Sequence, residues 1–273
     1  MTSAGGYAEV IGDPIAHSKS PAIHKSWLEA LNLDVDYRAT RVSRTELPAY
    51  VEDRRADPNW RGCNVTMPLK LDAVMLADEA SDRAVAAGAA NLLLHKDAAI
   101  LAGNTDVGAV LAMLGPRLQQ RPQSIITLLG NGGAARAVLV ATRMLGHSLI
   151  RIQARDLAAA YKLAVEFALE EEPRPFDAPI DSDGLINATP LGMAGYPPVP
   201  IDLSLMPGHG WVLDMVTDPA ETALLKAARG RGLDSIDGIA MLVEQAAASF
   251  MLLFGHEAPR EQDSQLMARL RSP

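Results

Sequence analysis

The chain has 273 residues, of which 48% are hydrophobic and 21% charged, a composition typical of a globular protein with one large or two medium domains. Its formal net charge of -8 argues against nucleic acid or an anionic membrane as a partner. Cys63 is the only cysteine, which excludes a disulfide framework. The first residues lack a signal-peptide pattern and no apolar run approaches the length of a membrane span, so we expect a cytosolic protein.

The first elements in chain order are a strand over residues 7–11 and a helix through residues 23–31, separated by a polar turn. Ser18 lies in this turn, and Ser20 stands directly before Pro21. Ser20 can be explained as a helix N-cap, because Pro21 suits the first helical turn. The alternative is that both hydroxyls hold a polyhydroxylated ligand at the carboxyl end of the strand.

A strand over residues 35–42, a helix over 46–55 and a strand over 61–66 come next, and Thr66 ends the third strand. Pro68 can start the following helix, which places Lys70 in its first turn. The positive end of a helix dipole destabilises an ammonium group, which helps a lysine that must trade protons near neutral pH. The competing interpretation is a solvated surface lysine.

Two short strands over residues 91–94 and 98–101 precede a helix over 109–114. Asn91 and Asp106 each have an ordinary explanation, Asn91 as the end of a turn and Asp106 as a helix cap. The dipeptide Gly115-Pro116 interrupts regular secondary structure after this helix, so a domain boundary near Asp106 is expected.

A glycine turn connects a strand over residues 124–129 to a helix in the middle of the chain. Such a turn brings backbone N–H groups and a helix N-terminus against a pyrophosphate, although similar turns also occur for packing. Gly130, Gly132 and Ala135 satisfy the pattern G-x-G-x-x-G/A. The residues of the turn are Gly130, Asn131, Gly132, Gly133, Ala134 and Ala135.

The next strand is expected over residues 146–153, and Ala154, Arg155 and Asp156 follow at its tip. The residue at this tip contacts the ribose of a bound dinucleotide, and a cation there accommodates a 2′-phosphate. Asp156 is either a ribose ligand or the N-cap of the helix over residues 157–169.

The last third of the chain is expected to contain strands over 184–187 and 211–215 and helices over 222–229, 239–254 and 265–270. Gln245 lies beside the apolar stripe of the long helix, so it points at a ligand or at water. Cys63 is expected to be a small buried residue. No two of the six histidines stand at metal-ligand spacing, so no metal is expected.

These motifs together resemble the shikimate dehydrogenase family along nearly the full length of the chain. Seven segments match the family's pattern in its order. They are GDPIAHSKSP at 12–21, NVTMPLK at 64–70, GAAN at 88–91, GNTD at 103–106, the glycine turn, NATPLGM at 187–193 and GIAMLVEQA at 238–246.

The resemblance implies an α/β enzyme of two domains with the site in the cleft between them. An N-terminal open α/β substrate domain would comprise residues 1–106 plus 238–273, and a Rossmann-like doubly wound cofactor domain residues 107–237. The family reduces 3-dehydroshikimate to shikimate reversibly with NADPH, in the shikimate pathway of aromatic amino-acid biosynthesis. Its members occur as monomers and dimers, so the oligomeric state stays open.

The resemblance also implies roles for particular residues. Lys70 and Asp106 would be the catalytic pair, and Lys70 would either donate the proton or stabilise charge on the substrate oxygen. The residues implied to hold the substrate are Ser18, Ser20, Thr66, Asn91 and Gln245. Those implied to hold the cofactor are Gly130, Asn131, Gly132, Gly133, Ala134, Ala135, Arg155, Thr189, Met215 and Gly238.

Three positions depart from the family's pattern. Asn131 replaces a common alanine, which is a mild change. Arg155 favours NADP, but Asp156 follows it where the family usually has threonine, so NAD stays possible. Thr217 stands where a tyrosine commonly encloses the substrate, which could shift preference toward quinate.

The alternatives are therefore a quinate or quinate/shikimate dehydrogenase that uses NAD, a shikimate-sensing paralogue without catalysis, and one module of a larger assembly. The paired serines Ser18 and Ser20 favour shikimate, and the retained pair of Lys70 and Asp106 argues against a sensor.

Overall fold

The computed structural model describes residues 5–200 and 202–272, which form two compact units. The first unit runs to Gly108 and includes Val243–Leu266, and the second comprises Ala109–Leu242 and the tail from Met267. The chain therefore passes from one unit to the other within α5 (Asp106–Gln120) and within α9 (Gly238–Phe254). Within the second unit, Arg271 Nε of the tail lies 2.7 Å from Asp237 Oδ2.

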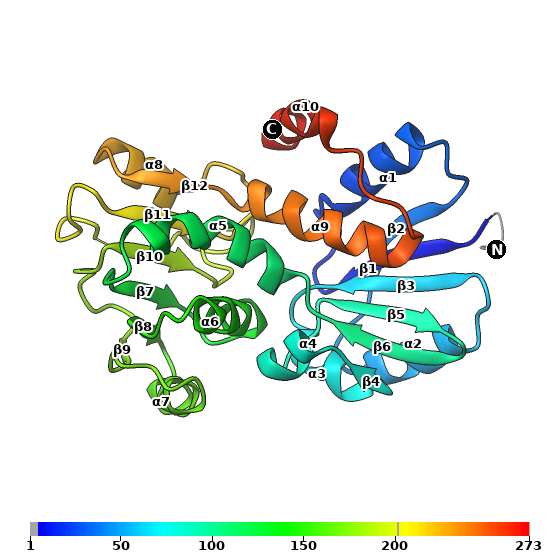
Figure 1. Ribbon diagram of the computed structural model, residues 1–273, viewed down its shortest axis with the longest axis horizontal. Coiled ribbons are helices and arrows are strands. Elements are labelled where there is room, and N and C mark those ends of the chain that lie inside the picture. The colour runs from blue at the N-terminus through cyan, green and yellow to red at the C-terminus, as the bar shows by residue number, and fades with distance from the viewer. Residues whose placement is uncertain (1–4, 201, 273) are drawn as a thin grey trace. The chain divides into compact units, whose positions relative to one another are not determined.

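The first unit is built on a mixed six-stranded sheet with the order β2-β1-β3-β5-β6-β4 (Figure 1). Its strands are β1 (Tyr7–Gly12), β2 (Asp36–Arg41), β3 (Trp60–Val65), β4 (Glu79–Ala80), β5 (Leu92–Lys96) and β6 (Ala99–Gly103). Strand β1 pairs in parallel with β2 and β3, and β5 pairs antiparallel with β3 and β6. The carboxyl ends of β1 and β3 therefore lie side by side, and the motifs that follow these strands start from one edge of the sheet.

Helices cover both faces of this sheet. The helices of this unit are α1 (Ser20–Ala30), α2 (Leu47–Arg55), α3 (Lys70–Ala73), α4 (Asp82–Ala87) and the C-terminal part of α9, and it also contains the short 3₁₀ turns Val74–Leu76 and Arg260–Gln262. The face that carries Ile11, Cys63 and Leu93 forms one apolar core with Leu47 and Val51 of α2. Alternation along the strands turns Tyr37 and Asn64 to the opposite face, where Tyr37 stacks on His24 of α1.

The α2 face also contains a buried carboxylate. Glu9 in β1 is fully buried and accepts hydrogen bonds from Arg38 Nη2 at 2.9 Å, Arg54 Nη2 at 3.1 Å and the Tyr50 hydroxyl at 2.7 Å. These partners compensate the desolvation of the carboxylate, and two of them anchor α2 to the sheet.

The second unit contains a six-stranded sheet with the order β12-β11-β10-β7-β8-β9, in which every pairing is parallel. Its strands are β7 (Ile126–Leu129), β8 (Ile150–Ala154), β9 (Arg174–Pro175), β10 (Gly184–Asn187), β11 (Trp211–Asp214) and β12 (Asp234–Ile236). The chain runs outward from β7 through β8 to β9, returns to the other side of β7 as β10, and continues to β12 (Figure 1). This doubly wound order has its switch point between β7 and β10, where such sheets bind ligands.

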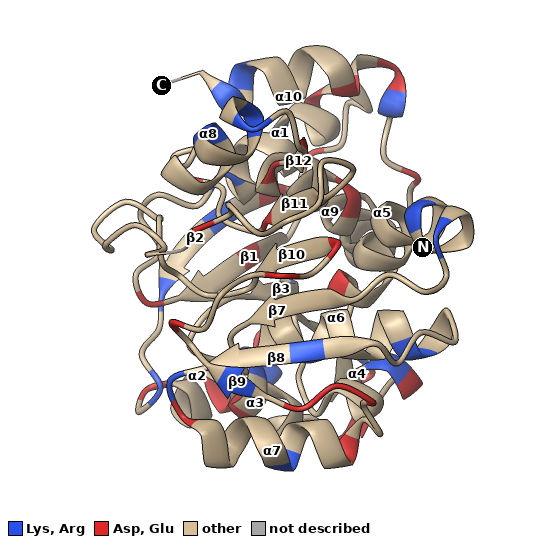
Figure 2. Cartoon of the chain, turned by 90° about the vertical axis from the view of Figure 1, so that its left-hand side faces the viewer, with Lys and Arg blue, Asp and Glu red and all other residues tan. Residues whose placement is uncertain are grey.

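The crossovers of this sheet are α6 (Gly133–Met144), α7 (Leu157–Glu166) and α8 (Ala223–Gly230). Leu224, Leu225 and Ala228 of α8 pack in one core with Leu185 and Val212 of the sheet. Figure 2 shows β7 and β10 uncharged along their length, with charged residues gathered mainly on the helices and loops around them. The expected α/β class, with an open α/β unit and a doubly wound parallel sheet, is confirmed.

Several local expectations are wrong. Helix α5 continues through Gly115 and Pro116, because the burial of Leu114 and Leu118 outweighs a proline penalty of about 3 kcal/mol. Ser20 is the first helical residue of α1 and not its N-cap. The helix that contains Lys70 begins at Lys70 itself and not at Pro68.

Among the strands and α-helices of the described residues, four were not expected: β4, α4, β9 and β12. Strand β12 pairs in parallel with β11, and Asp234 at its start is ion-paired with Arg117 of α5. The short helix α10 (Asp263–Arg271) agrees with the pattern near the C-terminus. Within the described residues, no helix has both the length and the apolar character needed to cross a bilayer.

Candidate active site

Lys70 and Asp106 form a largely buried ion pair in the first unit. Lys70 Nζ lies 2.6 Å from Asp106 Oδ2, and the two side chains are 17% and 6% exposed. Asp106 is the first residue of α5, where the helix dipole stabilises a carboxylate. Lys70 is the first residue of α3, a helix of only four residues, and its ammonium group faces the Asp106 carboxylate directly.

Asn91 holds the carboxylate of this pair in place. Its Nδ2 donates to Asp106 Oδ1 at 2.9 Å and to Thr105 Oγ1 at 2.8 Å, and its Oδ1 accepts from the Thr105 N–H at 2.7 Å. The backbone of Asn91 bonds to Val65 at 2.7 Å and to Gly103 at 3.0 Å, so it joins the ends of β3 and β6. Asn91 therefore orients a charged group and does more than end a turn.

Gln245 belongs to the same cluster. Its Oε1 lies 3.3 Å from Asn91 Nδ2 and 3.4 Å from Thr105 Oγ1, and the residue is buried. Of the two interpretations of this side chain, the one in which it faces bulk water is therefore wrong. The structure brings Lys70, Asp106, Asn91 and Gln245 together.

Thr66 and the two serines follow neighbouring strands of the same sheet. The Thr66 N–H bonds to the Ile11 carbonyl at 2.9 Å, and a Cβ on Gly12 would lie 2.5 Å from Thr66 Cγ2, so only glycine allows this approach. Ser18 Oγ accepts the Ser20 N–H at 3.4 Å within the turn after β1. Ser20 is buried and Ser18 is partly exposed.

Three polar residues that contribute to the cluster were missed from the sequence: Asn64, Thr105 and Ser249. Asn64 Nδ2 donates to Ser249 Oγ at 2.8 Å, and Ser249 Oγ lies 3.1 Å from Thr105 Oγ1. A signal existed for two of them, because Asn64 interrupts an apolar strand and Ser249 stands one helical turn after Gln245.

The glycine turn after β7 has the geometry that an anion site requires. Gly130 has φ +100°, and a Cβ there would lie 3.0 Å from Thr189 Cγ2, so this position demands glycine. Gly132 is the N-cap of α6, and no side chain caps the helix. A Cβ on Gly132 would meet nothing within 4 Å, so there is free space beside this uncapped helix N-terminus, as a phosphate site requires. Ala135 is buried, which lets the helix pack closely on the sheet.

A buried polar network shapes the ends of β10 and β11. Asp214 Oδ1 accepts from Asn187 Nδ2 at 2.9 Å, and Asp214 Oδ2 accepts from the Thr222 hydroxyl at 2.6 Å. The Thr189 hydroxyl donates to Asn187 Oδ1 at 2.6 Å. Burial raises the pKa of Asp214 above its usual range, although these hydrogen bonds oppose the shift. The network holds Thr189 beside Gly130.

Met215 and Gly238 meet at the start of α9. The Met215 N–H bonds to the Asn187 carbonyl at 3.0 Å, which continues the β10–β11 pairing. A Cβ on Gly238 would lie 2.4 Å from the Val216 carbonyl oxygen and 2.7 Å from that of Met215. Glycine at 238 therefore lets α9 begin directly against this backbone.

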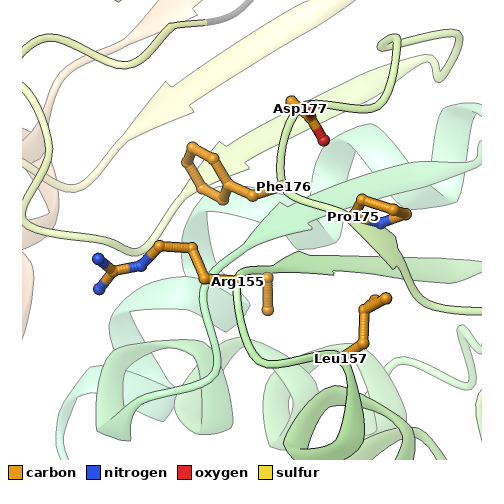
Figure 3. A pocket seen from close by; sticks show the side chains of 6 residues that line it. Arg155, Leu157, Pro175, Phe176 and Asp177 are labelled. Carbon is orange, nitrogen blue, oxygen red and sulfur yellow. The ribbon is translucent and has the colours of Figure 1, made fainter.

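A pocket of about 320 Å³ lies at the ends of β8 and β9. Its walls are the apolar residues Ala154, Leu157, Pro175 and Phe176, with Arg155 and Asp177 at its edge (Figure 3). Arg155 is exposed, as expected for a residue at the strand tip. Asp156 is the N-cap of α7 and accepts the Ala159 N–H at 3.0 Å, so the capping interpretation of this residue is confirmed.

Metal ligands do not accompany these groups. Among residues 5–200 and 202–272, no three His, Cys, Asp or Glu side chains cluster in a way that could hold a metal ion. The second unit combines a doubly wound sheet with an open helix N-terminus, and the first unit holds a buried lysine–carboxylate pair. This combination is typical of dehydrogenases that use a dinucleotide cofactor.

Comparison with known proteins narrows this class. The family described as shikimate dehydrogenase substrate binding domain matches residues 10–93, and the family described as shikimate 5′-dehydrogenase C-terminal domain matches residues 238–265. A protein of Sphingopyxis alaskensis named shikimate dehydrogenase (NADP(+)) is 44% identical over 270 residues, which cover 98% of this chain and 97% of that protein. The chain belongs to the shikimate dehydrogenase family.

Solved structures agree with this assignment. Shikimate 5-dehydrogenase from Thermus thermophilus, solved in complex with NADP(H) and shikimate, has a TM-score of 0.85 at 32% sequence identity. The match covers 97% of this chain and 99% of the Thermus chain. Quinate dehydrogenase from Corynebacterium glutamicum in complex with NAD has a TM-score of 0.82 at 28% identity, with 98% of each chain covered.

Proposed function

We propose that this chain is an NADP-dependent oxidoreductase that interconverts 3-dehydroshikimate and shikimate, the step that its relatives' name describes. The observation that carries the proposal is the buried Lys70–Asp106 pair, held by Asn91, in a chain 44% identical to a shikimate dehydrogenase (NADP(+)). A protein that only sensed the ligand would not need to bury an ion pair beside it.

Lys70 acts at the oxygen of the reacting carbonyl. Hydride transfer to a ketone builds negative charge on that oxygen, and a cationic N–H donor next to it lowers the energy of the transition state. Asp106 keeps the ammonium in position through the 2.6 Å contact and accepts a hydrogen bond from a neighbouring substrate hydroxyl. Ser18, Ser20, Thr66, Asn91 and Gln245 bind the carboxylate and the remaining hydroxyls of the substrate.

The second unit fits a dinucleotide. NADPH supplies the hydride when it is bound. The open N-terminus of α6 behind Gly130 and Gly132 suits the pyrophosphate, and the pocket beside Arg155 is large enough for an adenine ring. Thr189, Met215 and Gly238, at the ends of β10 and β11 and the start of α9, flank the remainder of the cofactor. The remaining residues of the turn that would hold the cofactor are Asn131, Gly133, Ala134 and Ala135.

Arg155 is proposed to bind the 2′-phosphate of NADPH, because the carboxylate of Asp156 is occupied as a helix cap. Arg155→Ala is expected to raise KM for NADPH about 10- to 100-fold, as expected for the loss of a charge-assisted hydrogen bond of about 1.5–3 kcal/mol. KM for NADH, which lacks the phosphate, is expected to stay within about twofold. Initial rates with both cofactors check this result.

The matched control is Arg121→Ala, an exposed arginine of the same unit. It removes the same charge far from the strand tip and is expected to leave both KM values unchanged. Equal effects of Arg155→Ala on NADPH and NADH would mean that Arg155 does not contact the 2′-phosphate.

The decisive experiment follows reduced nicotinamide by absorbance with shikimate or quinate, each tested with NADP and with NAD. Turnover with shikimate and NADP alone supports the proposal. A preference for quinate or NAD would support the second candidate, a quinate dehydrogenase, which Thr217 and the similarity to a quinate dehydrogenase in complex with NAD favour. Shikimate binding without turnover would identify a sensor.

We further propose that the protein acts in the cytosol, with the shikimate pathway's intermediates as small-molecule partners. Nucleic acid and membrane are not expected as partners, given the net charge of -8. A monomer and a homodimer are both compatible with the family, and the oligomeric state stays a prediction.

A further inference from the structure

A hydroxyl of α9 lies behind the Lys70–Asp106 pair and has been given no role so far. We propose that Ser249 is a positioning residue for the reaction: its hydroxyl orients that of Thr105, and through it the amides of Asn91 and Gln245. The inference rests on the proposed function, because the readout is turnover of shikimate.

Ser249 is a junction between three parts of the first unit. It is fully buried, and its Oγ lies 2.8 Å from Asn64 Nδ2 in β3, 3.1 Å from Thr105 Oγ1 before α5 and 3.0 Å from the Gln245 carbonyl of its own helix. A hydroxyl has one proton to donate and two lone pairs that accept. These three neighbours therefore use its full hydrogen-bonding capacity.

The donor and the acceptor can be assigned in each of the three hydrogen bonds of Ser249. Asn64 can only donate through Nδ2, and the Gln245 carbonyl can only accept, so Ser249 accepts from the first and donates to the second. The remaining lone pair of Ser249 then accepts the Thr105 proton at 3.1 Å. Because the Thr105 proton points to Ser249, the lone pairs of Thr105 are free to accept Asn91 Nδ2 at 2.8 Å.

This arrangement settles a competition at Asn91. The amide has two N–H groups, but three acceptors lie near it: Thr105 Oγ1 at 2.8 Å, Asp106 Oδ1 at 2.9 Å and Gln245 Oε1 at 3.3 Å. When Thr105 acts as an acceptor, Asn91 Nδ2 donates to Thr105 Oγ1 and to Asp106 Oδ1, and the Asp106 carboxylate keeps its position next to Lys70. Without Ser249 Oγ, the Thr105 proton turns to Gln245 Oε1 at 3.4 Å and occupies an acceptor that is proposed to bind substrate.

The side of the junction that faces away from Lys70 consists of buried, packed side chains. Asn64 Oδ1 accepts the Tyr37 hydroxyl at 2.8 Å, and the Tyr37 ring stacks on His24 at a centroid distance of 4.0 Å. All three residues are buried. Ser249 is therefore fixed through Asn64, which the packed Tyr37 side chain orients, and Ser249 in turn orients Thr105.

The test is steady-state kinetics of Ser249→Ala, with shikimate and NADP varied in turn, well below the melting temperature of the variant. We expect kcat/KM for shikimate to fall about 5- to 30-fold, as for the loss of one buried hydrogen bond of about 1–2 kcal/mol. KM for NADP is expected to stay within about twofold. The control is Ser182→Ala, a buried serine of the second unit that bonds to the Gly184 carbonyl at 2.9 Å. It should lower stability without changing KM for shikimate.

Two variants of Thr105 keep the inference testable if Ser249→Ala does not fold. Thr105→Ser retains the hydroxyl and should retain kcat/KM for shikimate, whereas Thr105→Val removes it and should lose as much as Ser249→Ala. The double variant Ser249→Ala/Thr105→Val should lose little more than either single one, because both break the same link.

Each outcome has a distinct meaning. If the wild-type protein turns over shikimate and both Ser249→Ala and Thr105→Val keep its kcat/KM, the role of Ser249 is overturned and the proposed function is not. Equal losses for shikimate and NADP would also overturn it, because they would indicate a general structural effect. A wild-type protein without shikimate turnover would contradict the proposed function, and the inference with it.

Discussion

Replacing Lys70 by alanine is expected to lower kcat for shikimate oxidation by about 10²- to 10⁴-fold, the usual contribution of a positioned proton donor or acceptor. KM for NADP is expected to change by less than about twofold, because Lys70 belongs to the first unit and the glycine turn to the second. Asp106 keeps the Asn91 N–H and the N-terminus of α5 as partners, so the variant should still fold. Initial-rate kinetics and thermal melting check these points.

Two further variants sharpen this result. Lys162→Ala removes an exposed lysine of α7 and should leave kcat unchanged. Lys70→Arg retains the positive charge but not the compact ammonium, so it should keep only part of the activity. A Lys70→Ala protein with wild-type turnover would remove Lys70 from the catalytic pair.

The stability of the protein is expected to fall as the pH is lowered below 6.5, and His24 is a defined cause. Burial among aromatic rings lowers the pKa of His24 from 6.5 to about 3, because neither ring nitrogen has a partner that would stabilise a charge. Below pH 6.5 the unfolded chain therefore binds a proton that the folded chain does not. The contribution of His24 is fully present above pH 6.5 and is lost at up to about 1.4 kcal/mol per pH unit on acidification.

His24→Leu isolates this contribution, because leucine is of similar size and does not titrate. Denaturant unfolding of both proteins between pH 7 and pH 4.5 should show the wild type losing about 2–3 kcal/mol more than the variant. Carboxylates titrate in both proteins and cancel in the difference. Parallel stability profiles would show that His24 is not held neutral in the folded state.

Local sequence patterns were sufficient for the elements with strong periodicity. The strand–glycine–helix pattern around Gly130 and the apolar stripe of α9 agree with the structure, because backbone conformation and amphipathic spacing are properties of neighbouring residues. The edge strands β9 and β12 were not predictable, since two or three residues carry no period. They form only because a longer parallel strand lies beside each of them.

The sequence by itself determined the α/β class, the strand–glycine–helix pattern around Gly130 and the membership of the shikimate dehydrogenase family. The tertiary structure alone decided that Asp106 pairs with Lys70 and that Asn64 meets Ser249, 185 residues further along the chain. It also decided that Asp156 caps α7. The reason is physical: burial and hydrogen-bond partners are set by elements distant in sequence, and no local pattern specifies them.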